Sequence, residues 1–243
     1  MDRDRRPDTS VIATAHTCSI GMPRRTVGAG AEQRTGSCDN EVVVHPSAVN
    51  ASAAVGLNVR AGRAVAVIVT GTRRSPSLAL RHEIALADPW VPESGHPYHR
   101  ELGDHGCAGE QERRRGCKAA ATASRRAIRA FVAAATAHGL EPRVGAVVTS
   151  SLDDPARVGV AHARAHAQED RLYRDAVESA LAACGLRVVT FLDKNVRREA
   201  DRRLARTGRP IAETLKVFSR VVGTPWGAAE KQAALAAWQV LPR

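Results

Sequence analysis

Four residues able to bind metal or share protons recur at helical spacing in the second half of the chain. His162, His166, Glu169 and Tyr173 follow one another at intervals of three or four, so on a helix they share one face. Two imidazoles at positions i and i+4 with a carboxylate three residues further on can reach a single metal ion. A polar helix side that faces solvent produces the same pattern more often than a metal site does.

A second group of chemically useful side chains lies in the segment 88–116. Three prolines and several glycines predict a long loop there, and long loops in compact domains are often functional. Trp90, His96, Tyr98 and His99 offer stacking surfaces and titratable rings that would suit contact with unpaired bases. The alternative is that these rings fix the loop to the core.

The charge of the chain favours an anionic partner. The formal net charge is +11, and nearly all basic residues are arginines, whose planar forks pair well with phosphate, although codon composition can produce the same bias. Many arginines lie close together in the sequence, and little more than Glu112 opposes their charge locally. They predict a nucleic-acid contact through Arg113, Arg114, Arg115, Arg125, Arg126, Arg129 and Arg164.

The cysteines and the apolar runs bear on the compartment. Five cysteines are scattered without a CxxC pair, which is typical of free thiols in a reducing compartment. Cys107 and Cys117 beside His105 match no common zinc spacing. No apolar run approaches the ~20 residues needed to cross a bilayer, and the first residues do not resemble a signal peptide. We therefore expect a cytoplasmic protein without a membrane partner.

The elements that would position these side chains begin after residue 54. Residues 1–54 show no sustained periodicity and are expected to be a disordered or loosely attached extension, whereas 55–243 reads as one α/β domain. VGLNV and AVAVIVTG, joined by a turn with glycine, predict a β-hairpin. LALRHEIAL alternates apolar and polar residues and predicts a third antiparallel strand, with His82 on its apolar side.

Helices and strands alternate in the remainder of the chain. Apolar periodicity predicts helices over 117–138 and 155–184, and the continuous runs RVGAVVTS and LRVVTFL predict buried strands. Two or three helices follow, the last beginning near Thr224 with Pro225 in its first turn. The later strands are expected to be parallel, joined by right-handed crossovers.

This order of three strands, helix, strand, helix, strand and helices resembles the ribonuclease-H-like superfamily. The resemblance implies a mixed five-stranded α/β sheet, with three antiparallel strands and then parallel strands, flanked by helices. In the nucleases of that superfamily, carboxylates from the first strand, the end of the fourth strand and the last helix converge on two Mg²⁺ ions, which activate water and stabilise the leaving oxygen.

The matching positions of this chain keep only part of that pattern. In VGLNVRAG the position of the first aspartate holds Asn58, and an amide cannot supply the charge. Thr149, Ser150 and Ser151 end the fourth strand, while the last helix offers Glu230. Asp153 and Asp154 follow the fourth strand but stand just before Pro155, where an aspartate more often caps a helix.

Three functional hypotheses follow. The first is a nucleic-acid-acting ribonuclease-H-like protein, as a divergent metal-dependent nuclease using Mg²⁺ or Mn²⁺. Its predicted catalytic residues are Asn58, His166, Glu169 and Glu230, and its predicted metal ligands are Asp154, His162, His166, Glu169 and Glu230. These groups, with Ser150, would have to share one cleft.

The second hypothesis is a noncatalytic basic binding or scaffold module that has lost the catalytic carboxylates. The third is a hydrolase or transferase that binds one metal on the face of His162 and His166 and closes the long loop over a small substrate. No glycine-rich phosphate fingerprint is found, which disfavours nucleotide hydrolysis.

Overall fold

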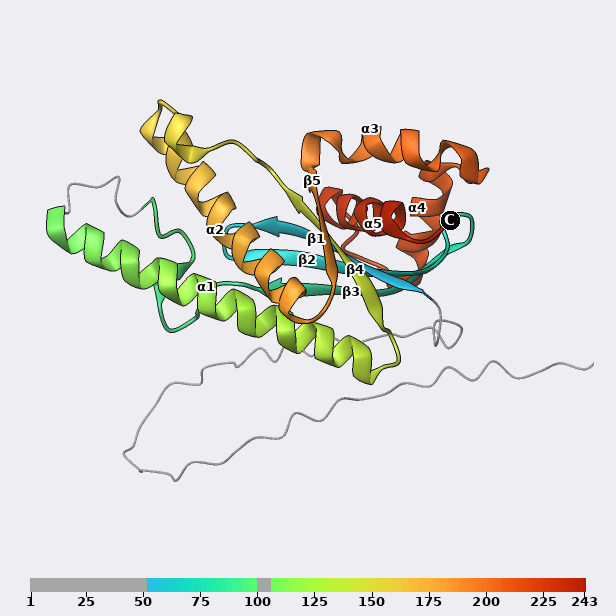
Figure 1. Cartoon of the computed structure of the whole chain (residues 1–243), viewed down its shortest axis with the longest axis horizontal. Coiled ribbons are helices and arrows are strands. Elements are labelled where there is room, and N and C mark those ends of the chain that lie inside the picture. The colour runs from blue at the N-terminus through green and yellow to red at the C-terminus, as the bar shows by residue number, and fades with distance from the viewer. Residues whose placement is uncertain (1–51, 100–105) are drawn as a thin grey trace, which may run out of the picture.

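The fold is built on one mixed sheet, seen in a computed structural model that describes residues 52–99 and 106–243 (Figure 1). Its strands are β1 (Ala53–Arg60), β2 (Arg63–Gly71), β3 (Pro76–Ala85), β4 (Pro142–Thr149) and β5 (Arg187–Leu192), in the order β3-β2-β1-β4-β5. The first three strands are antiparallel, and β4 and β5 run parallel to β1. The predicted mixed five-stranded sheet, with three antiparallel strands and then parallel strands, is therefore confirmed.

Helices cover both faces of the sheet and close two separate hydrophobic cores. One face packs against α1 (Gly106–Ala137) and α2 (Ala161–Ala183), with buried apolar side chains from both helices. The other face packs against α3 (Asp193–Leu204), α4 (Ile211–Val222) and α5 (Ala228–Val240). Among the described residues, no helix combines the length and the apolar character needed to cross a bilayer.

The central strand β1 sets the direction of its side chains by strict alternation. Val55 and Leu57 point toward α1 and α2, so Asn58 between Leu57 and Val59 points toward α5. The backbone of α5 lies directly on Gly56, where a Cβ atom would come within 1.9 Å of the Ala233 carbonyl oxygen. Glycine is therefore needed at this close approach of strand and helix.

The helices begin at places different from those that the apolar periodicity predicts. Helix α1 starts eleven residues earlier than expected, at Gly106 rather than 117, because Glu110 accepts hydrogen bonds from Arg113 and Arg114 one turn later. The loop is correspondingly shorter. Helix α2 starts only at Ala161, and α5 starts at Ala228 rather than near Thr224.

The late start of α2 has a local cause. The Asp154 carboxylate accepts a hydrogen bond from the Ala156 N–H over 3.2 Å and caps a single 3₁₀ turn, Pro155–Arg157, which the chain leaves in an extended conformation at Val158. The capping interpretation of Asp154 is confirmed. The Asp154 carboxylate therefore holds a turn that lies just before the helix.

The third strand departs from simple alternation. A register shift between Ile68 and Val69 of β2 places Leu78 in the α5-side core, whereas Leu80 lies in the core beneath α1. His82 lies on the α1 side, as predicted, and stacks on Phe131 with ring centroids 5.8 Å apart.

Some sequence predictions concern residues that the structure does not describe. Residues 1–51 lie outside the described ranges, so the N-terminal extension over 1–54 and the domain boundary at 55 remain predictions, although β1 already begins at Ala53. His105 and the Cys107 side chain also lie outside the described residues. Cys117 and Cys184 are free thiols.

Candidate metal centre

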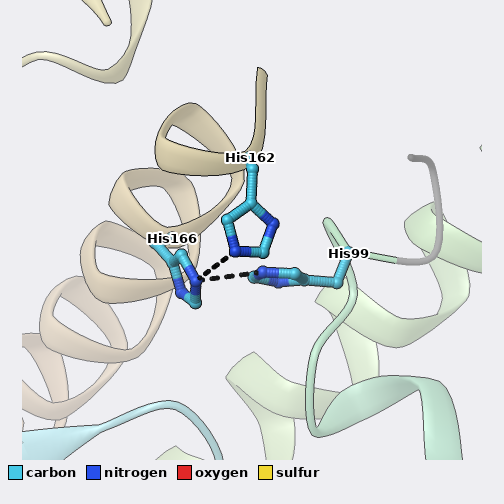
Figure 2. A group of neighbouring side chains, drawn as sticks. All are labelled: His99, His162 and His166. Carbon is cyan, nitrogen blue, oxygen red and sulfur yellow. Dashed lines mark hydrogen bonds between the residues drawn. The ribbon is translucent and has the colours of Figure 1, made fainter. Parts of the chain in front are cut away.

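Three imidazoles from two distant segments meet at the start of α2 (Figure 2). His162 and His166 lie one helical turn apart, and His99 approaches them from the loop that follows β3. The Nε2 atom of His166 is 3.1 Å from Nε2 of His162 and 3.3 Å from Nε2 of His99. All three candidate ligand atoms lie within 4.8 Å of one another. We call these three residues the imidazole cluster.

The spacing of the imidazole cluster fits a single transition-metal ion. Zinc binds imidazole nitrogen at about 2.0–2.1 Å in tetrahedral geometry, which sets neighbouring nitrogens roughly 3.3 Å apart. Two of the three nitrogen–nitrogen separations, 3.1 and 3.3 Å, agree with that value, and the third pair of nitrogens lies within 4.8 Å. Three protein ligands leave the fourth position open. His162 and His166 are exposed, so this open side can face a large ligand.

A buried carboxylate fixes the orientation of the cluster. The Glu169 side chain is 1% exposed, and its two oxygens lie 2.8 Å from Nδ1 of His99 and 3.1 Å from Nδ1 of His96. Because an ionised carboxylate only accepts hydrogen bonds, Nδ1 of His99 donates to Glu169, and in the neutral ring this leaves Nε2 with a lone pair that faces the other two rings. Carboxylate–imidazole pairs of this kind orient metal ligands in many sites. His96, His99 and Glu169 also form a second group with metal-ligand spacing.

Tyr173 attaches the loop to α2. Its buried hydroxyl donates to the carbonyl oxygens of Ser94 and Gly95. Burial raises the pKa of Tyr173 above its ordinary value, so the hydroxyl stays protonated and available as a donor. The face of α2 on which these residues lie thus has two parts. Buried Glu169 and Tyr173 hold the loop, whereas the imidazoles of His162 and His166 are exposed.

The position on β1 that was predicted to match a metal-binding aspartate holds one member of a pair of amides. The Asn58 Nδ2 atom donates to Oε1 of Gln232 on α5 over 2.6 Å, and Nε2 of Gln232 reaches the carbonyl oxygen of Asp193 over 3.4 Å. The Asp193 carboxylate is itself paired with Arg60 at 3.0 Å. Magnesium is held by carboxylate oxygens, so these residues do not fit a two-magnesium site.

Glu230 is committed to the structure of α5. Its carboxylate accepts from Arg81 on β3 over 2.9 Å and from the Gly227 N–H over 2.8 Å, at the first turn of the helix. Burial alone would raise the pKa of Glu230, but these hydrogen bonds outweigh it and hold the pKa below its ordinary value. The contacts of Glu230 are those of a helix cap and a partly buried ion pair.

The residues predicted to share one cleft therefore fall into separate groups. Asn58 and Glu230 contact residues on the α5 side of the sheet, whereas His166 and Glu169 lie with the loop on the side of α1 and α2. Strand alternation turns Asn58 away from α2, which explains the separation. Ser150 donates to the carboxylate of Asp170 on α2 instead of to a residue of either group. The one-cleft expectation is wrong.

Two contributors to these groups were not singled out from the sequence for the parts they play. Gln232 follows Glu230 by two residues, but an amide gives no signal of a metal site. The sequence predicts His99 as a residue that could contact unpaired bases, whereas the structure places it with the paired histidines of α2. The recurrence of paired histidines in HPYH and HARAH was the available signal.

The arginines predicted to bind nucleic acid differ in their availability. Arg113 and Arg114 pair with Glu110, and Arg115 pairs with Glu93, so the beginning of α1 is more neutral than the sequence indicates. Further along α1, three arginines are exposed: Arg125, Arg126 and Arg129.

A cavity of about 530 Å³ between α1 and α2 gathers several of the remaining cations. Arg125, Arg164 and Arg171 line it together with Tyr98, which precedes His99 in the chain. The cavity-lining residues of α2 lie roughly half a turn around the helix from the imidazoles. The cavity and the imidazole cluster therefore flank the same helix without forming one pocket.

Comparison with known proteins gives a remote likeness in structure alone. The chain is similar to Thermus thermophilus RuvC in complex with Holliday junction substrate, with 12% identity, 77% of this chain and 91% of the RuvC chain covered, and a TM-score of 0.46. A second structure of Thermus thermophilus RuvC matches with 10% identity, 77% and 92% coverage and a TM-score of 0.45. No protein-family model and no curated protein sequence matches.

Proposed function

We propose that this protein is a nucleic-acid-acting hydrolase whose metal site is the imidazole cluster rather than a pair of carboxylates. The observation that carries the proposal is the convergence of Nε2 atoms from His99, His162 and His166 at 3.1 and 3.3 Å. The ribonuclease-H-like sheet and the net charge of +11 support a phosphate-bearing polymer as substrate. Free Cys117 and Cys184 are in keeping with a cytoplasmic location.

The donor set favours some metals over others. Imidazole suits zinc and also binds manganese, whereas magnesium prefers a shell made only of oxygen ligands. Of the two ions predicted from the sequence, the imidazole cluster therefore favours Mn²⁺ over Mg²⁺. Zn²⁺ becomes a third candidate. A divalent ion at this place would polarise a phosphodiester and lower the pKa of water. Glu169 would hold His99 in the ligating orientation, and Arg125 and Arg171 would position neighbouring phosphates.

A cleavage assay on the full chain tests this proposal. Labelled single-stranded, duplex and branched DNA and RNA are incubated with Zn²⁺, Mn²⁺ or Mg²⁺. We expect product with Zn²⁺ or Mn²⁺, and a loss on the order of 100-fold in His166→Gln. His138→Gln is the matched control, because His138 lines an apolar groove beside Phe131. Cleavage without added metal, or full activity in His166→Gln, would contradict the proposal.

A noncatalytic nucleic-acid-binding module is the second candidate, and the amide pair of Asn58 and Gln232 favours it. This candidate predicts binding that weakens steeply with salt, because counterions are released, and no product with any metal. The double variant Asn58→Asp, Gln232→Glu separates the two candidates. Cleavage that appears with Mg²⁺ only in this variant would indicate an enzyme that has lost its carboxylates, whereas the imidazole proposal predicts no such gain.

A further inference from the structure

Arginines line a second concave site, far along the chain from the imidazole cluster. The pocket has a volume of about 330 Å³ and is lined by Arg73, Arg74, Arg202, Arg203, Arg206, Thr207 and Arg243. The turn between β2 and β3 supplies the first two residues, the end of α3 and the following 3₁₀ turn supply the next four, and Arg243 follows α5. We call it the arginine pocket.

The arginine pocket lies at the end of the sheet opposite the imidazole cluster. The turn between β2 and β3 adjoins the beginning of β1, where the Gly71 N–H donates to the Ser52 carbonyl oxygen over 2.8 Å. The imidazoles lie at the other end, where β4 leads into α2. Figure 1 shows the C-terminus and the start of α2 far apart on the molecule. The two sites are therefore distinct.

The charges of the arginine pocket are poorly compensated by the protein. Among the described residues, only Arg203 of this set has a carboxylate within ion-pair distance, Glu199 at 3.5 Å. Burial, followed by the nearby charges of Arg243 and Arg203, lowers the pKa of Arg73 from its ordinary value. Like charges gathered in a concave surface repel one another, and a bound anion would relieve that repulsion.

Several contacts hold the pocket in shape before any ligand arrives. The Nε atom of Arg73 donates to the Leu241 carbonyl oxygen over 2.9 Å, and the Trp238 indole N–H donates to the Arg73 carbonyl oxygen over 2.9 Å. The Arg203 guanidinium lies over the ring of Phe191, 5.4 Å from its centroid. Fixed guanidinium groups lose less conformational freedom when they bind a ligand.

We propose that the arginine pocket binds a compact phosphate group that carries more than one negative charge. Guanidinium forks pair with phosphate oxygens in bidentate fashion, and six of them in one small cavity match a concentrated charge. The terminal phosphate of a nucleic-acid strand and the diphosphate of a nucleotide share this chemistry. The proposal does not depend on the imidazole cluster or on the hydrolase activity.

Titration of the full chain with inorganic pyrophosphate at constant ionic strength tests the proposal by calorimetry. We expect saturable binding, weakened at least about tenfold in Arg202→Gln, Arg206→Gln. The matched control is Arg197→Gln, Arg198→Gln, which removes the same amount of charge from α3 outside the pocket and should change affinity less than about twofold. Without ligand, the pocket variant should unfold at the same temperature as the wild type or higher, because repulsion is relieved.

Competition between two oligonucleotides distinguishes the sources of phosphate. A 5′-phosphorylated strand that displaces pyrophosphate better than its dephosphorylated twin would identify strand ends as the ligand, and equal weak displacement by both would identify a nucleotide-like ligand. Both results are displacement of bound pyrophosphate, so both require that pyrophosphate binds in the arginine pocket. The proposal is overturned if the wild type shows no saturable binding, or if the pocket variant and the control variant lose affinity equally.

Discussion

Glu230 lies where the last helix was predicted to offer a metal ligand, yet its carboxylate joins α5 to β3. The side chains of Glu230 and Arg81 are 7% and 13% exposed, so their ion pair is largely shielded from water. Removing one charge from such a pair leaves the other without its main partner. The two interpretations, metal ligand and structural ion pair, therefore make opposite predictions for a neutral variant.

Glu230→Gln should reduce the free energy of unfolding by about 2–3 kcal/mol, because Arg81 loses a shielded, charged hydrogen bond. Urea unfolding at neutral pH measures this change. Glu213→Gln, on the exposed first turn of α4, is the control and should stay within about 0.5 kcal/mol of the wild type. Unchanged stability together with weakened metal binding would restore Glu230 as a ligand.

The same residue predicts how stability depends on pH. The folded pKa of Glu230 lies below its ordinary value, so its charge stabilises the folded protein above about pH 4.5 and this contribution disappears as the pH falls through the lower folded pKa. The wild type should therefore lose its advantage over Glu230→Gln on acidification. Urea unfolding of both proteins from pH 7 to pH 3 measures it, and a constant difference would rule out this linkage.

At the scale of elements, the contact between β1 and α5 tolerates no side chain at Gly56. A Cβ there would overlap the Ala233 carbonyl oxygen, at 1.9 Å, and would force the helix off the strand. Gly56→Ala should lower the free energy of unfolding by more than about 3 kcal/mol or prevent folding. Gly159→Ala, which meets nothing within 4 Å, should change it by less than about 1 kcal/mol. Equal unfolding midpoints in urea would contradict the packing described.

The strands could be predicted because their signals are local. Continuous apolar runs form β4 and β5, and the glycine turn at Gly62 joins β1 to β2. The order of the strands along the chain and their relative directions could therefore be predicted. The start of α1 depended on ion pairs made by Glu110, and the break in β3 depended on a shift in its partner strand. These features arise from contacts that periodicity does not record.

The candidate site was only half predictable for a similar reason. His162 and His166 follow from helical spacing, but the third imidazole comes from a loop whose position is set by Glu169 and Tyr173. The expected contact between Asn58 and the histidines of α2 does not form, because the two groups lie on opposite faces of the sheet. Each face packs against its own hydrophobic core, and the alternation of β1 turns Asn58 toward the core of α5. A tertiary arrangement of this kind cannot be inferred from spacing within one element.

At the scale of the whole molecule, exposed arginines on α1 should dominate any contact with duplex nucleic acid. The triple variant Arg125→Gln, Arg126→Gln, Arg129→Gln should lower the magnitude of the slope of log K against log salt by about 2–3. Exposed arginines elsewhere provide a control of equal charge, namely Arg143→Gln, Arg187→Gln, Arg220→Gln. Fluorescence anisotropy at several salt concentrations measures both slopes. Equal slopes would show that α1 makes no special contact.

The most direct test of the imidazole cluster is a Co²⁺ titration followed by visible absorption. Co²⁺ can occupy sites that bind zinc, and the cluster should bind one equivalent of it. The visible absorption band of the four-coordinate ion should rise with added Co²⁺ and then reach a plateau. Glu169→Gln should weaken this binding about 10–100-fold by releasing His99, and His99→Gln, His166→Gln should abolish it. Failure of the wild type to saturate, or an unchanged band in the double variant, would contradict the metal site.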